Sequence, residues 1–177
     1  MSLKQISLPE FAGKGVLITG ASTGIGAELA RAFATQGAKV GLHYNSSKDA
    51  AEALATEIRS AGGTVELVRA DASEPNELRA AIEDVAARLG GLRGLINNAG
   101  GMVRRVPYEE VTDKDYDEIM DLNARSILVA SKAALPHLKR DGGFVINTTS
   151  IAARNGAAGG AGLYGSSKSF VSNVTRG

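Results

Sequence analysis

The sequence predicts an α/β protein built on one doubly wound parallel sheet. Short β-branched runs alternate with longer helical patterns along the chain, and most of these runs are apolar with little alternation. Strands that helices cover on both faces have this continuous apolar character. We therefore expect parallel strands joined by right-handed crossovers, in a single domain over residues 1–177.

The expected strands and helices follow one another in regular order. The strand-like runs are Gly15–Thr19, Lys39–Tyr44, Thr64–Ala70, Leu92–Asn97 and Gly143–Thr149. Apolar stripes between them predict helices. These stripes are Ile25, Leu29 and Phe33; Leu54 and Ile58; and Leu78, Ile82, Val85 and Leu89. The glycine- and alanine-rich stretch Gly156–Gly162 is interpreted as an active-site loop.

A longer helix is expected over Asp113–Lys139, with apolar residues on more than one face. One stripe holds Tyr116, Ile119, Met120, Ile127 and Ala134, and the apolar residues elsewhere on its circumference are Leu122, Leu128, Val129 and Leu135. A subunit interface in a homodimer or homotetramer would bury the second face. Cover by neighbouring helices of the same chain stays open as the alternative.

Composition excludes several classes of function. The 20 basic and 19 acidic residues give a net charge of +1, and aromatic residues make up 5% of the chain, so we expect no nucleic-acid partner. Cysteine is absent, which excludes disulfides, thiolate catalysis and cysteine–metal sites, and we expect no metal. Residues 1–11 lack the apolar core of a signal peptide, and no run approaches the roughly 18 apolar residues of a membrane span. A cytoplasmic protein is expected.

A glycine-rich turn, LITGASTGIGAEL, ends the first strand and opens the first helix. Backbone N–H groups and the helix dipole favour a pyrophosphate at such a turn, and glycines let it approach closely. An ordinary turn is the alternative, but the position after the first strand favours a nucleotide site. The predicted contacts here are Gly20, Ser22, Thr23, Gly24, Ile25 and Gly26.

The spacing TGxxxGIG, which starts at Thr19, resembles the short-chain dehydrogenase/reductase family, including members similar to 3-oxoacyl-[acyl-carrier-protein] reductases. NNAG at Asn97–Gly100, a serine after the fifth strand and a later YxxxK pair agree with it in order, and the resemblance covers essentially the whole chain. It implies a Rossmann fold. It also implies that the family's further C-terminal strands and substrate-covering lid are missing from this chain. By the same resemblance, the additional cofactor contacts are Asp71, Ala72, Asn98, Ala99 and Gly100.

Two stretches, Tyr44–Lys48 and Tyr164–Lys168, each place a phenol four residues before an ammonium. Tyr44 ends the second strand, where such folds meet the adenosine ribose and where an NAD enzyme usually has an acidic residue. This chain has no acidic residue there and offers amide, hydroxyl and ammonium groups that could donate to a 2′-phosphate, so NADP is favoured over NAD as the cofactor. These donors are Asn45, Ser46, Ser47 and Lys48, with Ser22 and Thr23 nearby in the glycine loop. No arginine stands in this stretch to grip a phosphate bidentately, and a solvated turn is the alternative.

Tyr164 follows the fifth strand and is predicted to be the general acid that protonates a developing alkoxide. Lys168 would lower the pKa of this phenol, since a nearby cation favours phenolate. Ser150 would hydrogen-bond the substrate oxygen, with Thr148 and Thr149 open as alternatives. The resemblance implies that Lys168 also holds the nicotinamide ribose and that Asn123 holds a proton-relaying water with it.

These observations predict an NADP-dependent oxidoreductase that interconverts a ketone and a secondary alcohol by hydride transfer. Its partner is a small carbonyl or alcohol substrate. 3-Oxoacyl thioesters, sugars and other small carbonyls stay open, with 3-oxoacyl reduction favoured. The alternative is a non-catalytic nucleotide-binding or interaction protein with the same fold.

Overall fold

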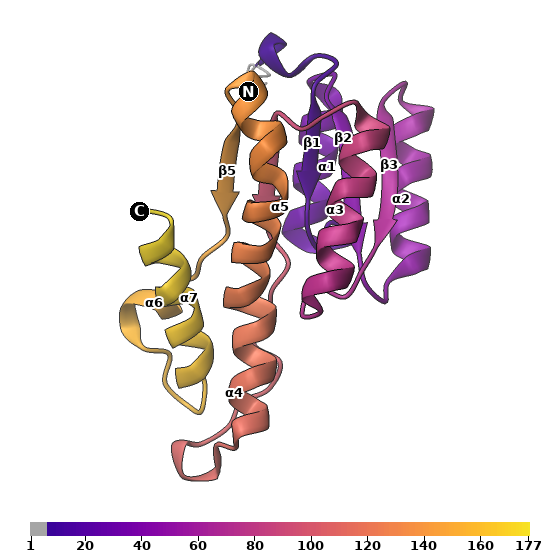
Figure 1. The fold of residues 1–177 in the computed structure, drawn as a ribbon. Coiled ribbons are helices and arrows are strands. Elements are labelled where there is room, and N and C mark those ends of the chain that lie inside the picture. Colours follow the sequence, from indigo (N-terminus) through magenta and orange to yellow (C-terminus); the bar gives the residue numbers. More distant parts are fainter. Residues whose placement is uncertain (1–6) are drawn as a thin grey trace, which may run out of the picture.

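In the computed structural model, five parallel strands form one sheet in the order β3-β2-β1-β4-β5 (Figure 1). The structure describes residues 7–177, so the expectation for the N-terminal segment falls partly outside the described residues. The doubly wound parallel sheet is confirmed, and only strand ends differ from the predicted runs. The strands are β1 (Gly15–Ile18), β2 (Lys39–Tyr44), β3 (Thr64–Arg69), β4 (Gly94–Asn97) and β5 (Phe144–Asn147).

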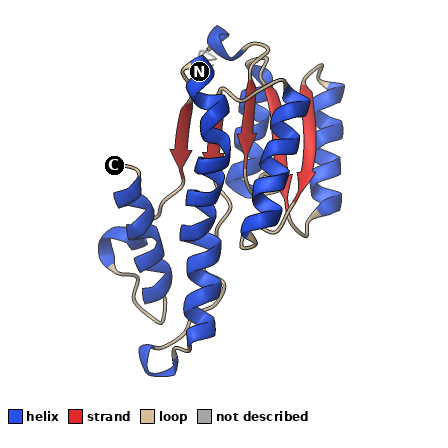
Figure 2. Cartoon of the chain, viewed as in Figure 1, coloured by secondary structure: helices blue, strands red, loops and turns tan. Residues whose placement is uncertain are grey.

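Helices cover both faces of this sheet (Figure 2). Successive residues of a strand point to opposite faces. Val16 and Ile18 pack in a cluster with α1 and α2, whereas Leu17 packs in a second cluster with α3 and α5. The helices are α1 (Gly24–Thr35), α2 (Lys48–Ser60), α3 (Pro75–Leu89), α4 (Asp113–Met120), α5 (Ser126–Asp141), α6 (Ala152–Asn155) and α7 (Gly162–Val174), with single 3₁₀ turns at Pro9–Phe11 and Tyr108–Glu110.

The long helix predicted over Asp113–Lys139 is two helices, α4 and α5, joined by a π-helical turn at Asp121–Arg125. Its predicted inner stripe is correct at Ile119 and Ile127, which are 2% exposed. The stripe is wrong at Tyr116, whose side chain is exposed. The π turn does not account for this difference, because Tyr116 and Ile119 both precede it on α4; what the turn changes is the rotation of α4 relative to α5.

The predicted second apolar face divides. Val129 packs against the core cluster of α3 and α5, as the alternative of cover within the chain requires, whereas Leu128 is 46% exposed and Leu135 is 43% exposed, with no cover from residues 7–177. Another expectation fails at β5, where Val145 and Ile146 are exposed. This strand lies at the edge of the sheet, beside β4 alone.

Ile25 was expected in the inner stripe of α1, but its side chain is 67% exposed at the start of that helix. The buried positions of α1 are Gly26, Ala27 and Ala30. Within residues 7–177, no helix combines the length and the apolar character that crossing a membrane requires.

Candidate active site

The candidate site lies where the strand order reverses. The chain runs outward from β1 through β2 to β3 and then returns to β4 on the other side of β1, so the connections that follow β1 and β4 lead in opposite directions from two paired strands. Open α/β sheets bind ligands at the carboxyl ends of the strands at such a point. A cavity of about 610 Å³ opens there between the segments that follow β1, β2, β4 and β5. The predicted residues that line it are Gly20, Ser22, Thr23, Ile25, Asn45, Ser46, Ser47, Ala72, Asn98, Ala99, Gly100, Ser150, Tyr164 and Lys168.

The glycine loop is held against the segment that follows β4. Thr19 Oγ1 accepts hydrogen bonds from the backbone N–H groups of Asn98 and Ala99, each at 3.0 Å. The Asn98 side-chain amide donates to the Gly20 carbonyl at 2.9 Å. A Cβ at Gly26 would lie 2.4 Å from that carbonyl and 2.6 Å from Asn98 Nδ2. Only glycine fits at position 26, because any side chain would push the loop away from β4.

The N-terminus of α1 faces this loop. Thr23 is the N-cap residue in an extended conformation, and its side chain makes no capping hydrogen bond. The N–H groups of the first helical turn therefore have no side-chain cap, which is the arrangement that favours an anion. Gly24, with φ of 56°, has open space where a Cβ would stand and lines an adjacent groove instead of the main cavity.

The segment after β2 forms the adenosine end of the cavity. Asn45, Ser46 and Ser47 line it, whereas the Tyr44 side chain is buried in the core and does not. Asp71 lies beside this turn and accepts a 3.0 Å hydrogen bond from Asn45 Nδ2. The Ser73 hydroxyl donates to the same carboxylate and holds the pKa of Asp71 below its ordinary value.

Arg69 also lies beside this turn, and sequence reasoning missed it. Its Nε donates to the Asn45 carbonyl at 3.2 Å. Arg69 is the last residue of β3, directly opposite Tyr44 in the register of the two strands. The predicted runs end at Tyr44 and Ala70, so the pairing of Arg69 with Tyr44 depends on a register that the sequence does not show.

Tyr164 and Lys168 lie one turn apart on α7 and face the cavity together. The Lys168 Nζ lies 5.9 Å from the centroid of the Tyr164 ring and donates to the Thr148 carbonyl at 3.0 Å. Lys168 is 3% exposed, and burial lowers the pKa of its ammonium. A cation is thus held beside the phenol in a setting with little water.

Three hydroxyls follow β5 and line the cavity, and the hydrogen bonds of two of them, Thr149 and Ser150, differ. Thr149 Oγ1 donates to the Lys168 carbonyl at 3.0 Å and contacts Ser172 Oγ at 2.8 Å, so its hydroxyl is engaged with α7. Ser150 Oγ accepts a 3.2 Å hydrogen bond from the Ala152 N–H, and no described residue accepts its proton. The Ser150 proton is therefore available to an oxygen in the cavity.

Asn123 lies inside the π turn and is fully buried. Its amide donates to the Gly101 carbonyl at 2.8 Å and to the Ile119 carbonyl at 2.9 Å, and its oxygen accepts from the Gly101 N–H at 3.0 Å. A Cβ at Gly100 would lie 2.7 Å from Asn123 Oδ1 and 3.0 Å from Lys168 Nζ. Asn123 and Lys168 are thus brought together around Gly100, although Asn123 does not line the cavity itself.

His43 is a second residue that sequence reasoning missed, and unlike Arg69 it lines the cavity. Its ring is 2% exposed, and burial lowers its pKa to about 4. A single histidine in an otherwise apolar strand gives no sequence signal of a role, since most such residues are satisfied core histidines.

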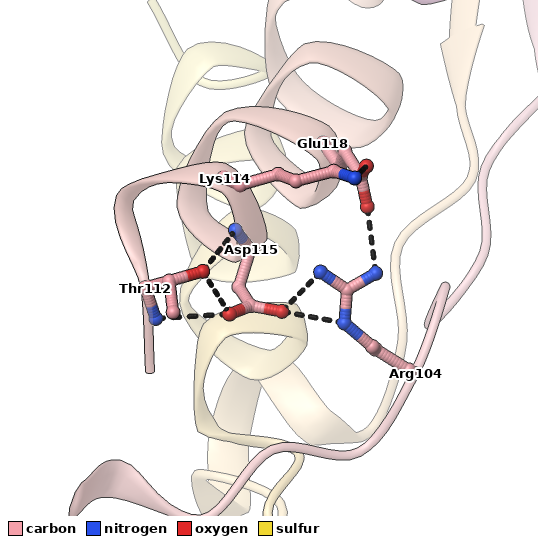
Figure 3. Close-up of polar contacts among 5 residues, drawn as sticks. All are labelled: Arg104, Thr112, Lys114, Asp115 and Glu118. Carbon is pink, nitrogen blue, oxygen red and sulfur yellow. Dashed lines mark hydrogen bonds and ion pairs between the residues drawn. The ribbon is translucent and has the colours of Figure 1, made fainter. Parts of the chain in front are cut away.

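A charged network fixes the segment between β4 and α4. Figure 3 shows the Arg104 guanidinium between the carboxylates of Asp115 and Glu118, with the Glu118 contact at 2.7 Å. Asp115 also forms a capping box with Thr112 at the start of α4. The hydrogen bonds from the hydroxyl and backbone N–H of Thr112 lower the pKa of Asp115, and Arg104 lowers it further. The segment is therefore anchored to α4 through Arg104.

The same segment contacts the loop that precedes Tyr164. Arg105 donates to the carbonyls of Ala158 and Gly159 at 3.2 Å and 3.0 Å, and the Val106 N–H donates to the Gly160 carbonyl at 2.8 Å. The stretch Gly156–Gly162, interpreted from the sequence as an active-site loop, thus lies between α6 and the Tyr164 helix and is tied to the segment after β4.

The sequence model described as short chain dehydrogenase matches residues 14–177. The chain belongs to the short-chain dehydrogenase family. This short-chain dehydrogenase is 41% identical over 139 residues to an uncharacterized oxidoreductase of Methylorubrum extorquens. The aligned stretch covers 78% of this chain and 55% of the relative. The chain therefore spans little more than half the length of that curated relative.

Two similar solved structures differ in their nicotinamide cofactor. One is an NADH-dependent reductase, A1-R′, described as responsible for alginate metabolism; it has a TM-score of 0.91 and 39% identity, over 96% of this chain and 71% of its own. The other, from Burkholderia cenocepacia, is a complex with NADP and has a TM-score of 0.89 and 36% identity, over 94% and 67% of the two chains. Family membership therefore supports a nicotinamide cofactor but does not decide between the two.

Proposed function

We propose that the protein transfers a hydride between NADP(H) and a ketone or secondary alcohol, with Tyr164 as the general acid and base. The observation that carries this proposal is a single cavity that reaches from the uncapped N-terminus of α1 to the Tyr164–Lys168 pair. One end suits a pyrophosphate and the other suits proton transfer. A dinucleotide that spans the cavity would bring its reactive end beside the phenol.

The shape of the cavity supports a dinucleotide. Gly26 leaves no room for a side chain between the glycine loop and Asn98, which fixes the loop close to the segment after β4. Gly100, which lines the cavity, leaves no room for one between Asn123 and Lys168. The glycine loop and the reactive end are thus held at fixed places around one cavity, as binding of a dinucleotide requires. The bound dinucleotide would supply the hydride.

The residues at the reactive end divide the remaining chemistry. In reduction, the Tyr164 hydroxyl donates its proton to the carbonyl oxygen as that oxygen gains negative charge. The Lys168 ammonium favours the phenolate that results, and the buried position of Lys168 strengthens this charge interaction. The Ser150 hydroxyl donates a hydrogen bond to the same oxygen. In oxidation, the phenolate takes the proton back.

The segment after β2 supports NADP over NAD. Asn45, Ser46 and Ser47 line the adenosine end and carry no acidic group of their own, and the Asp71 carboxylate beside them is bonded to Asn45 Nδ2 and Ser73. Arg69, which braces the Asn45 carbonyl, adds a cation beside the same turn. NADPH should bind at least about tenfold more tightly than NADH, a difference of about 1.4 kcal/mol. Fluorescence titration of the two cofactors measures the ratio, and equal affinities would contradict this preference.

The catalytic assignment is tested by deleting one hydroxyl. Tyr164→Phe should lower turnover by about 10² to 10⁴ and leave NADPH affinity within a few-fold. Tyr44→Phe removes the same group from a core residue that does not line the cavity, so it is the matched control and should leave turnover intact. Turnover of both variants is measured with an accepted ketone under saturating NADPH. If Tyr164→Phe turns over as fast as the wild type, the assignment of Tyr164 as the general acid is wrong.

The same measurements separate this enzyme from a non-catalytic nucleotide-binding protein. Wild-type protein that binds NADPH tightly but oxidises none of it with a broad ketone panel would favour the binding protein. The panel should include 3-oxoacyl thioesters, reducing sugars and small ketones, because the described cavity does not distinguish these classes.

A further inference from the structure

His43 makes hydrogen bonds from both ring nitrogens and from its backbone. The Gly20 N–H donates to Nδ1 at 3.0 Å, and Nε2 lies 3.1 Å from the Ala70 carbonyl oxygen. The His43 carbonyl accepts from the Ala21 N–H at 2.8 Å. One residue near the end of β2 therefore contacts the first two residues of the glycine loop and the end of β3.

These partners define the protonation of the ring. A backbone N–H can only donate and a carbonyl oxygen can only accept, so Nδ1 must be unprotonated while Nε2 carries the hydrogen. The ring is neutral in this arrangement. Protonation of Nδ1 would replace the acceptor that Gly20 needs with a second donor.

Gly20 is the point at which the loop leaves β1, and it has little freedom to move. Its φ is 61°, a conformation that favours glycine, and a Cβ there would lie 2.9 Å from Ala99 Cα. Its carbonyl accepts from the Asn98 amide, and its N–H is held by the His43 ring. The orientation of the Gly20 peptide sets the direction in which the following loop amides and the start of α1 point.

We propose that His43 is a positioning residue of the cofactor site: its ring holds the Gly20 peptide so that the glycine loop faces the pyrophosphate of the dinucleotide. This inference rests on the proposed dinucleotide binding. His43 acts through the loop, so its loss should weaken binding of the pyrophosphate without slowing the chemical step.

Two amide substitutions separate the contact of the ring with Gly20 from its contact with Ala70. Asparagine can place a carbonyl oxygen close to the position of Nδ1, and glutamine can place an amide nitrogen close to that of Nε2. His43→Asn should keep the Gly20 contact and lose the Ala70 contact, whereas His43→Gln should do the reverse. His43→Leu removes both while it keeps an apolar side chain in the core.

The test is the dissociation constant of NADPH, of ADP and of adenosine for wild type and the three variants. His43→Gln and His43→Leu should weaken NADPH and ADP by about fivefold to tenfold, while His43→Asn stays within about twofold. Adenosine, which lacks the pyrophosphate, should bind all four proteins alike. In steady-state kinetics, His43→Gln should raise KM for NADPH and leave kcat unchanged.

Unfolding in urea without cofactor separates positioning from a purely structural role. The inference is overturned if His43→Gln binds NADPH as wild type does, if His43→Asn loses as much affinity as His43→Leu, or if lost affinity simply follows lost stability. Failure of both amide variants to fold would assign the ring to sheet folding and would also overturn it. A wild-type protein that binds no dinucleotide overturns the proposed function along with this inference.

Discussion

Lys168 combines two features that oppose each other. A buried ammonium is costly, and burial lowers its pKa, yet the proposed chemistry needs its charge beside Tyr164. The hydrogen bond to the Thr148 carbonyl offsets part of this cost because it satisfies one of the three ammonium donors. No other hydrogen bond of this ammonium is seen within residues 7–177, so in the proposed mechanism its remaining donors would contact a ribose and the phenol oxygen.

The stability of the fold should fall as the pH drops from about 6.5 to 4, because of His43. Its pKa is lowered to about 4 in the folded chain, against an ordinary value of about 6.5 in an unfolded one. The unfolded chain therefore binds the proton more readily. The full contribution is present above pH 6.5 and is lost as the pH falls through 4.

Urea unfolding measures this effect. Between pH 7.5 and pH 5, His43 should remove on the order of 2 kcal/mol of unfolding free energy. Asp71, the charged neighbour of His43, has its own pKa lowered from 3.8 and so titrates mainly below this window. The His43→Asn variant should lose less stability over the same interval. Identical losses in the variant and the wild type would contradict the assignment to His43.

Site residues could be predicted from the sequence where a local motif fixes both their identity and their place. Tyr164 and Lys168 are one helical turn apart in any helix, and the glycine loop follows directly from its strand. Arg69 and His43 were not predictable in this way. Their contacts depend on the register between β2 and β3 and on the direction of one ring, which arise only when distant segments pair.

At the scale of elements, hydrophobic periodicity predicted the order of strands and helices, but it predicted one helix where α4 and α5 are joined by a π turn. Helical periodicity assumes a constant rotation per residue, and the turn at Asp121–Arg125 breaks it. The break has a local benefit, because it turns the Asn123 amide toward the Gly101 backbone. The irregular turn therefore lies beside the candidate site, and π turns are often found at functional sites.

The anchor of the segment between β4 and α4 should affect substrate more than cofactor. Arg104→Ala frees this segment from Asp115 and Glu118, and with it the contacts of Arg105 and Val106 to the loop before Tyr164. Exposed charge pairs such as that with Glu118 contribute at most about 1 kcal/mol. Buried Asp115 keeps its hydrogen bonds to Thr112 when Arg104 is removed. KM for the carbonyl substrate should therefore rise by up to about fivefold.

Arg88→Ala is the matched control for this measurement. Arg88 also bonds two carboxylates, those of Glu66 and Asp84, but it lies on α3 and lines none of the cavity that holds Tyr164. Steady-state kinetics and NADPH titration are compared for the two variants. A similar rise in KM for both, or a loss of NADPH affinity in Arg104→Ala alone, would contradict the anchoring role.

At the scale of the whole molecule, the exposed face of α5 predicts a homo-oligomer. Leu128 and Leu135 lie seven residues apart on one side of this helix, and within residues 7–177 nothing covers them. A second copy that presents the same face would bury both in a closed, symmetric interface. Light scattering should show a dimer or tetramer at micromolar concentration, and Leu135→Glu should dissociate it.

Glu83→Lys is the control for this substitution, since it changes a charge at an exposed position of the neighbouring α3. It should leave the oligomer intact. A wild-type protein that is monomeric at micromolar concentration would contradict the homo-oligomer predicted from the exposed face of α5.

The position of β5 at the edge of the sheet predicts that the chain aggregates when it is heated. Val145 and Ile146 are exposed on a strand whose outer hydrogen-bonding groups have no neighbouring strand in the described sheet. An exposed apolar edge is a template on which another chain can add a strand. Heating at high concentration should therefore end in aggregation rather than in reversible melting. The kinetic stability of the chain would then be described by its half-life at a given temperature, which should shorten as the protein concentration rises. A midpoint of thermal unfolding would not describe it.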